Sequence, residues 1–203
     1  MNISLSELST NSVYHLMTQT VVPRPIAWVL SENHDSSLNL APFSYFNAIC
    51  SDPPLCILSM GKKPDGDTKD TAVNLSVGAQ CVVHIAQVQH ADLVTATAAT
   101  MAYGESEIQA TELKLLNHSN WALKRIAECP IAYYCKVHSV QQIGNTPQQV
   151  VFVEVLEVYI DDKVATVSNG RISVDALKVN PLARLGANQY ASLGEVFSKA
   201  RPK

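Results

Sequence analysis

Apolar runs separated by turn-forming residues recur along the chain, and most have the length and β-branched content of strands. Pro23 and Pro25 mark the start of the first run as a sheet edge or a strand beginning. Turn-forming clusters such as residues 32–37 (ENHDSS) and 52–54 (DPP) separate the runs. The pattern predicts strands at residues 21–31, 38–49, 55–60, 80–87, 131–138 and 149–161.

The two runs nearest the C-terminus have the clearest strand pattern. In residues 131–138 consecutive side chains point to opposite faces, whereas residues 149–161 are apolar on both faces apart from two glutamates. We therefore expect the second run to be covered on both sides. About ten residues that include glycine, asparagine and proline join the two runs, which predicts a hairpin.

Helical patterns are few and short. We expect helices at residues 70–77, ending at Gly78, at residues 90–101 and at residues 119–127. Because regular helices do not separate the strands, a doubly wound sheet is the weaker alternative. The elements predict a mainly β protein, a β-barrel with short helical insertions. No linker or repeat interrupts residues 1–203, so one domain is expected.

Composition and charge exclude several classes of partner. The chain of 203 residues has a net charge of −3 and scattered Lys and Arg, so it offers no field for nucleic acid. No run approaches the roughly 18 apolar residues of a membrane span, and residues 1–10 do not have the pattern of a signal peptide. We expect a cytoplasmic protein without a membrane or nucleic-acid partner. The charged fraction of 16% is low, which is compatible with a buried contact between copies.

Cysteine usage agrees with a reducing compartment. The cysteines are odd in number, lie mostly in apolar runs and form no C-x-x-C pair: Cys50, Cys56, Cys81, Cys129 and Cys135. This arrangement predicts reduced core thiols rather than a disulfide framework or a metal site.

Familiar catalytic signatures are missing from the sequence. It contains no G-x-S-x-G elbow, Walker loop, H-E-x-x-H or G-x-G-x-x-G motif. The six histidines are far apart, and His84 lies in an apolar strand, where a satisfied core histidine is expected rather than a ligand. Any enzymatic chemistry would therefore belong to a cofactor.

The densest polar pattern lies between residues 39 and 71. Small polar side chains interrupt an otherwise apolar segment at Asn39, Ser44, Asn47 and Ser51. Such groups, together with exposed backbone amides, suit a ligand that has an apolar ring and an edge of donors and acceptors.

The loop that follows has the chemistry of a phosphate site. It supplies Lys62, Lys63 and Lys69, and then Thr71 beside a predicted helix start. Cations, a hydroxyl and helix-end N–H groups together bind phosphate. The alternative is a polar strand edge and a solvated loop, in which Asp70 or Thr71 only caps the helix.

Several segments combine into a family pattern. RPIAWV at residues 24–29, NLAPFSYFNA at 39–48, SDPP at 51–54 and DGDTKDT at 65–71 occur in that order, and RLGANQYASLGEVF closes the pattern at 184–197. Together they resemble the flavin reductase-like proteins with the FMN-binding split-barrel fold, specifically the flavoredoxin-type branch. The resemblance spans nearly the whole chain.

The resemblance implies a site for FMN. In the family an N-A-x-x-S segment runs along the flavin ring, largely through backbone contacts, and it corresponds here to Asn47, Ala48, Ile49, Cys50 and Ser51. The strand after the double proline and a K-D-T segment hold the phosphate and ribityl end, which points to Ser59, Lys69, Asp70 and Thr71. Ser44 and Lys62 complete the expected cofactor-binding set. Family members are usually homodimers with FMN near the subunit interface, so we expect FMN between two copies.

One position departs from the family. A pair of glycines commonly follows the Arg-Leu of the C-terminal motif, and Ala187 stands here in place of the second. Its methyl group would narrow access to whatever lies beneath. The roles of Arg184 and Tyr190, packing or interface, stay open.

Three functions follow from these expectations. The first is an FMN-dependent oxidoreductase that takes hydride from NADH or NADPH and passes electrons to free flavin, a protein or an organic acceptor. The second is a flavin-carrying electron-transfer or storage protein without turnover. The third is a split-barrel protein that has lost the flavin. No recognisable nicotinamide-binding signature separates the first two.

Overall fold

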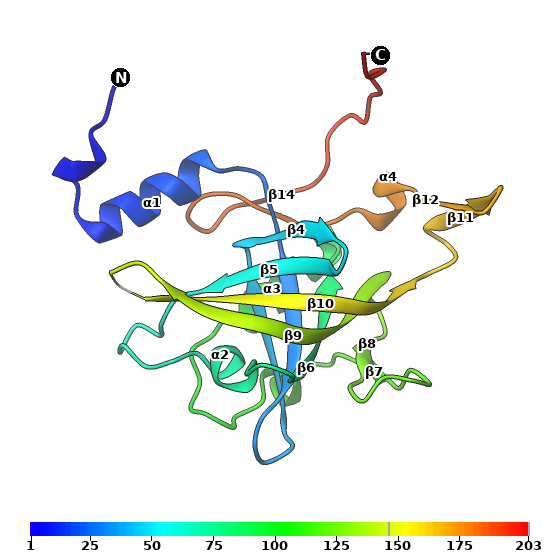
Figure 1. Ribbon diagram of the computed structural model, residues 1–203, viewed down its shortest axis with the longest axis horizontal. Coiled ribbons are helices and arrows are strands. Elements are labelled where there is room, and N and C mark those ends of the chain that lie inside the picture. Colours follow the sequence, from blue (N-terminus) through cyan, green and yellow to red (C-terminus); the bar gives the residue numbers. More distant parts are fainter. Residues whose placement is uncertain (146, 203) are drawn as a thin grey trace.

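The computed structural model describes residues 1–145 and 147–202, and a seven-stranded antiparallel sheet forms its centre (Figure 1). The strand order is β3-β2-β6-β9-β10-β5-β4. The strands are β2 (Ala27–Glu32), β3 (Leu38–Phe43), β4 (Phe46–Ser51), β5 (Pro54–Met60), β6 (Gln80–Ile85), β9 (Ile131–Ile143) and β10 (Gln148–Ile160). This mainly β architecture confirms the expected fold class.

The two edge strands of the sheet are consecutive in the sequence. β3 and β4 lie at opposite ends of the strand order, yet only Ser44 and Tyr45 join them. The sheet therefore curls until its edges come close, and β3 contacts β5. The expectation of one extended segment at residues 38–49 was wrong, because the chain bends at Ser44 and continues on the other side of the split in the barrel.

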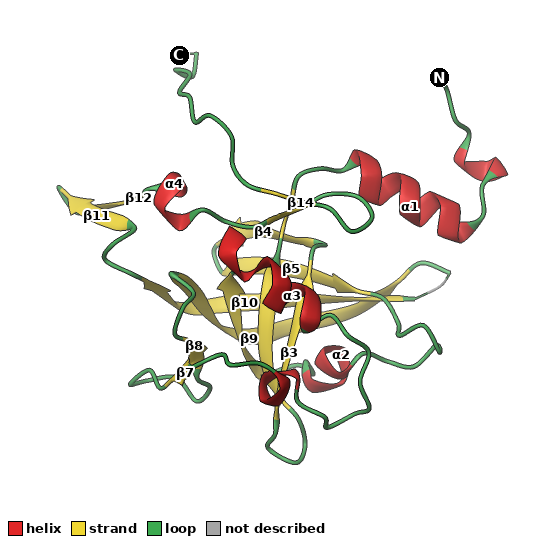
Figure 2. Ribbon diagram, turned by 180° about the vertical axis from the view of Figure 1, so that it is seen from behind, coloured by secondary structure: helices red, strands yellow, loops and turns green. Residues whose placement is uncertain are grey.

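Burial on two sides explains the apolar run of β2. Ala27 and Val29 point into the barrel and pack with residues of β6, β9 and β10. Trp28 and Leu30 point outward and pack beneath α3 (Ala91–Ala96), which crosses this outer face in Figure 2. A strand that is buried on both faces requires a continuous apolar sequence.

Shorter elements surround the barrel. Helix α1 (Thr10–Thr20) and a small sheet of β1 (Arg24–Pro25), β13 (Ala183–Arg184) and β14 (Tyr190–Ala191) lie at one end of it, near both termini (Figure 1). The remaining elements are η1 (Leu5–Glu7), α2 (Asp70–Asn74), η2 (Val88–His90), η3 (Glu107–Ala110), β7 (Leu115–Leu116), β8 (Arg125–Ile126), β11 (Ala165–Ser168), β12 (Arg171–Val174) and α4 (Ala176–Val179). No helix in the described part of the chain is long and apolar enough to cross a membrane.

The predicted hairpin is confirmed as β9 and β10, which pair along almost their whole length. β9 continues to Ile143, so the connection is shorter than expected. The expectation that the second strand is covered on both sides was wrong for its last third, where Leu156 and Val158 are exposed.

All three predicted helices differ from the structure because tertiary hydrogen bonds end or replace them. α2 stops at Asn74, whose side-chain amide donates to Ser31 and Asn33. α3 stops at Ala96, because the next residue, Thr97, accepts the Trp28 indole N–H at 2.8 Å.

The third helix, at residues 119–127, is absent from the structure. Arg125 and Ile126 instead pair with β7 as strand β8. The backbone N–H of Ile126 donates to Nε2 of His84 at 2.9 Å, which fixes this strand against the barrel.

Candidate functional site

The split in the barrel opens into a cavity of about 440 Å³. Ala41, Pro42 and Phe43 of β3 form an apolar wall. The bend at Ser44 and Tyr45 forms the adjoining side. A cavity of this size suits a small molecule or a cofactor.

Three lysines gather at the polar end of this cavity. Lys63 is held by Asp70, with 2.6 Å between Nζ and Oδ1, and it also donates to the Met101 carbonyl at 3.0 Å. Burial, and secondly the charge of Lys63, lower the pKa of Lys69 from its ordinary value, although Asp70 opposes the shift. Lys62 is more exposed and completes the set. These lysines would bind an anion strongly, because folding has already removed part of their water.

Thr71 lies in the same wall, almost fully buried. Its Oγ1 accepts a hydrogen bond from the Asn39 side-chain amide at 2.8 Å, so its own hydroxyl hydrogen is available to a ligand. The N-cap residue of α2 is Lys69, and no side chain caps the helix. The alternative in which Asp70 or Thr71 serves only as a cap is therefore wrong.

A buried carboxyl group also reaches this cavity. Glu107 of η3 accepts the backbone N–H of Leu40 at 3.0 Å. Burial is the main cause that raises the pKa of this carboxyl, and the Leu40 hydrogen bond opposes it. Sequence reasoning missed Glu107, because a glutamate between turns carries no motif and its partner lies in a distant strand.

The structure brings six of the eleven expected cofactor residues together around the cavity. They are Ser44, Ser59, Lys62, Lys69, Asp70 and Thr71. The cavity also uses residues without an earlier signal: Tyr14 of α1, Gln148 and the turn at residues 97–101. Tyr14 was missed because no helix was expected at residues 10–20, where only Ser9 as N-cap marks the start of α1.

The other five expected residues lie on β4, outside the lining of this cavity. They are Asn47, Ala48, Ile49, Cys50 and Ser51, and their side chains are exposed. β4 begins directly after Tyr45 and is an edge strand, so its outer backbone groups are free of strand pairing within the described residues. A β-bulge interrupts the pairing between Ala48 and Cys50, a feature that is frequent next to active sites.

A second cavity, of about 330 Å³, lies beside the first and shares Tyr14, Pro42, Ser44 and Ala98 with it. Arg184 and Tyr190, whose roles the sequence left open, both line it. The Arg184 guanidinium lies 4.7 Å from the centre of the Tyr190 ring, and the Tyr190 hydroxyl is 3.0 Å from Oγ1 of Thr95.

The backbone at Ala187 has a conformation that glycine adopts more readily than alanine. Ala187 has φ of +49°, a left-handed conformation that strains a residue with a side chain. It also lines the second cavity, so its methyl group occupies space at that wall.

His84 is a satisfied core histidine, as expected. Its ring is fully buried, Nδ1 is 3.0 Å from the Trp28 carbonyl, and Nε2 accepts from Ile126. These contacts require the neutral tautomer with hydrogen on Nδ1, and burial lowers the pKa of His84 to about 4. Four of the five cysteines are buried, whereas Cys50 is exposed. The described residues contain no group of three or more His, Cys, Asp or Glu that could hold a metal ion.

The fold, the cavity and the comparisons with known proteins define a flavin-related oxidoreductase. Nitrilotriacetate monooxygenase component B from Bacillus cereus has a similar structure, with a TM-score of 0.88 and 29% identity over 98% of both chains. The 2-nitrobenzoate 2-nitroreductase NbaA of Pseudomonas fluorescens is similar over 100% of this chain and 96% of its own, with a TM-score of 0.87 and 28% identity.

The sequence comparison gives the particular family. The family described as flavin reductase like domain matches residues 17–173. The protein YwrF of Bacillus subtilis is 34% identical over 97% of this chain and 96% of its own length. The chain belongs to the flavin reductase-like domain family, which confirms the resemblance seen in its motifs.

Proposed function

We propose that this protein is an FMN-dependent oxidoreductase that accepts hydride from NADH or NADPH, with FMN in the cavity at the split. The observation that carries the proposal is the division of this one cavity into an apolar wall on β3 and a cationic end at Lys62, Lys63 and Lys69. FMN needs both, because it joins an apolar ring system to a dianionic phosphate. When bound, it would supply two-electron transfer that the side chains alone lack.

The residues at the phosphate end of the cavity would have two different roles. Lys69 and Thr71 would bind the phosphate directly, with help from Ser59 and Lys62. Asp70 would not meet the phosphate through its carboxylate, because like charges repel and because that carboxylate already holds Lys63 at 2.6 Å. Its task would be to position Lys63.

The ring would extend past Tyr45 to the outer edge of β4. Free backbone N–H and C=O groups at residues 47–51 would there meet the polar edge of the flavin, as the family pattern implies. β4 is exposed in the single chain, so a second copy would cover this edge. A homodimer with FMN near its interface fits this arrangement.

The named activity of one relative, a nitroreductase, supports electron transfer to a small organic acceptor. Anaerobic mixing of the FMN-loaded protein with NADH or NADPH tests the donor. We expect the flavin absorption to bleach within a few seconds, because enzymes commonly turn over at about 1–10³ per second. Bleaching by dithionite alone would contradict reductase activity and favour the electron carrier.

Tyr45 is the aromatic side chain placed to cover one face of the flavin ring. It lines the cavity and is exposed, whereas Phe46 packs into the barrel core and Phe43 is buried in the cavity wall. If Tyr45 covers the ring, Tyr45→Ala will speed nicotinamide oxidation; if the ring face is open, the rate will stay the same or fall. Phe46→Ala would not report on the ring face, because it would leave a cavity in the core.

A further inference from the structure

We infer that the second cavity is a binding site for a small planar organic carboxylate, next to the proposed flavin site. The cavity holds about 330 Å³ and lies between α1, the end of α3 and the loop at residues 184–190. Its volume is at the lower end of ligand pockets, so it suits a one-ring molecule rather than a dinucleotide.

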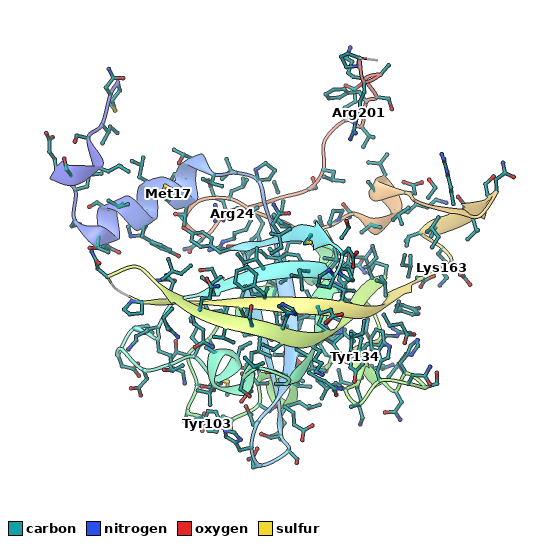
Figure 3. All side chains as sticks on the ribbon, viewed as in Figure 1. Met17, Arg24, Tyr103, Tyr134, Lys163 and Arg201 are labelled. Atoms are coloured by element: carbon teal, nitrogen blue, oxygen red, sulfur yellow. The ribbon has the colours of Figure 1, made fainter. Side chains whose placement is uncertain are left out.

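Arg24, a buried cation that has no acidic partner among the described residues, lies in the wall of this cavity. Arg24 is 5% exposed and donates to the carbonyls of Thr18 at 2.6 Å, Val21 at 2.8 Å and Leu185 at 2.8 Å. Figure 3 shows Arg24 beside α1 at the edge of the barrel. The ion pairs among the described residues lie elsewhere, at Lys63–Asp70 and His118–Glu157. The charge of Arg24 is therefore balanced by carbonyl dipoles and not by a carboxylate.

No acidic side chain lines this cavity within residues 1–145 and 147–202. A buried cation of this kind favours an anion in the adjoining space, because the dehydration of the cation has already occurred on folding. The last contact of Arg24, from Nε to Oγ of Ser44 at 3.4 Å, is long and reaches the wall that both cavities share.

Arg184 supplies the group that would meet the carboxylate. Its guanidinium donates one hydrogen bond, from Nη2 to the Ala187 carbonyl, and stacks over Tyr190. Among the described residues its other N–H donors make no hydrogen bond. A guanidinium binds a carboxylate through two parallel hydrogen bonds, and its plane is held here by the aromatic ring. Asn188 adds a polar side chain to the same wall.

Apart from His15 and Thr18, most of the remaining lining suits a flat apolar body. Ile26, Val94 and Leu185 are aliphatic, and the rings of Tyr14 and Tyr190 face the same space. Apolar walls with one cationic corner select an organic anion over an inorganic one. Binding of such an anion does not require flavin, so this inference and the proposed function fail separately.

The test is calorimetric titration of the protein with benzoate and with benzyl alcohol, which has the same ring without the charge. We expect benzoate to bind at least about tenfold more tightly, the effect of a charged hydrogen bond. We also expect FMN to leave benzoate bound, because Arg184, which would hold the carboxylate, lines the second cavity and not the first. Equal binding of both compounds, displacement of benzoate by FMN, or no binding at about 10 mM benzoate would each overturn the inference.

Two variants locate the anion. Arg184→Gln should weaken benzoate about tenfold or more and leave benzyl alcohol unchanged. Arg171→Gln, at an exposed arginine of β12, is the matched control and should change neither. An Arg184→Gln protein that binds benzoate like the wild type would contradict the assignment, and the comparison of the two ligands on wild-type protein stands even if the variant does not fold.

Discussion

At the scale of single residues, the cations of the first cavity are not equivalent. Lys63 is occupied by Asp70 and the Met101 carbonyl. Lys69 has no ion pair among the described residues, and burial lowers its pKa. A phosphate would therefore give Lys69 the negative partner that Lys63 already has in Asp70.

Lys69→Met is the sharpest test of this assignment, since it keeps the apolar part of the side chain. FMN affinity should fall about tenfold to a hundredfold, because a hydrogen bond to a charged group is lost. Riboflavin affinity should not change, because riboflavin has no phosphate. Fluorescence titration measures both, and Lys163→Met on the exposed loop after β10 is the control. Equal losses for the two flavins would refute a phosphate role.

His84 makes stability depend on pH in a defined direction. Its pKa is about 4 in the folded protein and close to 6.5 when unfolded. Between these values the unfolded state binds more protons, so the free energy of unfolding falls as pH falls. We expect a loss of about 2 kcal/mol between pH 7 and pH 4.5 in denaturant titrations.

The matched variants for this pH dependence are His84→Gln and His138→Gln. Gln cannot titrate, so the first variant should lose most of the difference between the two pH values. His138 is exposed on β9 and should behave like the wild type after substitution. If the His84→Gln protein keeps the full pH dependence of stability, then groups other than His84 cause it.

At the scale of elements, one side chain fastens the N-terminal helix to the barrel. Arg24 joins the end of α1, through Thr18 and Val21, to Leu185 in the C-terminal loop. Arg24→Leu leaves these carbonyls without their donor, and the expected loss of stability is about 2 to 4 kcal/mol. Hydrogen exchange should rise in α1 and in residues 184–190 first. Unchanged exchange in both segments would show that packing alone holds them.

Element prediction from sequence succeeded where burial dictates the pattern. The apolar run that became β2 and the alternation in β9 follow from local position in the sheet. The bend at Ser44 did not follow, because it depends on closure of the barrel by strands far along the chain. The predicted helices were too long or absent for the same reason, as the hydrogen bond between Thr97 and Trp28 illustrates.

The site was predicted to the extent that its residues are contiguous. The loop and turn that contain Lys62, Lys69 and Thr71 carry charge and hydroxyl groups in one stretch, and the structure places them on one cavity. Glu107 and Tyr14 reach that cavity from distant segments with no motif. The second cavity was beyond sequence reasoning, since Arg24 and Arg184 meet only when β1 pairs with β13.

For the whole molecule, we expect a second copy of the chain to cover an exposed apolar hairpin. The hairpin of β11 and β12 extends from the barrel (Figure 1), and its cross-strand partners Val167 and Ile172 are 73% and 65% exposed. A two-stranded sheet is marginal by itself in water. Contact with another subunit would cover this pair and stabilise the hairpin.

Sedimentation at micromolar concentration should give twice 22.1 kDa for the wild type. Changing Val167 and Ile172 together to Lys should shift the protein toward the monomer, because two charges would then face an apolar surface. Val77→Lys, at another exposed apolar residue, should remain a dimer. A wild-type protein that is monomeric and still binds FMN would show that the flavin site does not need a second chain.

Titration of the protein with FMN, followed by the quenching of flavin fluorescence, tests directly whether the cavity at the split holds this cofactor. We expect saturation at one FMN per chain, with affinity in the micromolar range or tighter and with riboflavin bound more weakly. Absence of quenching at about 50 μM FMN, or riboflavin bound as tightly as FMN, would contradict a cavity that holds the flavin by its phosphate.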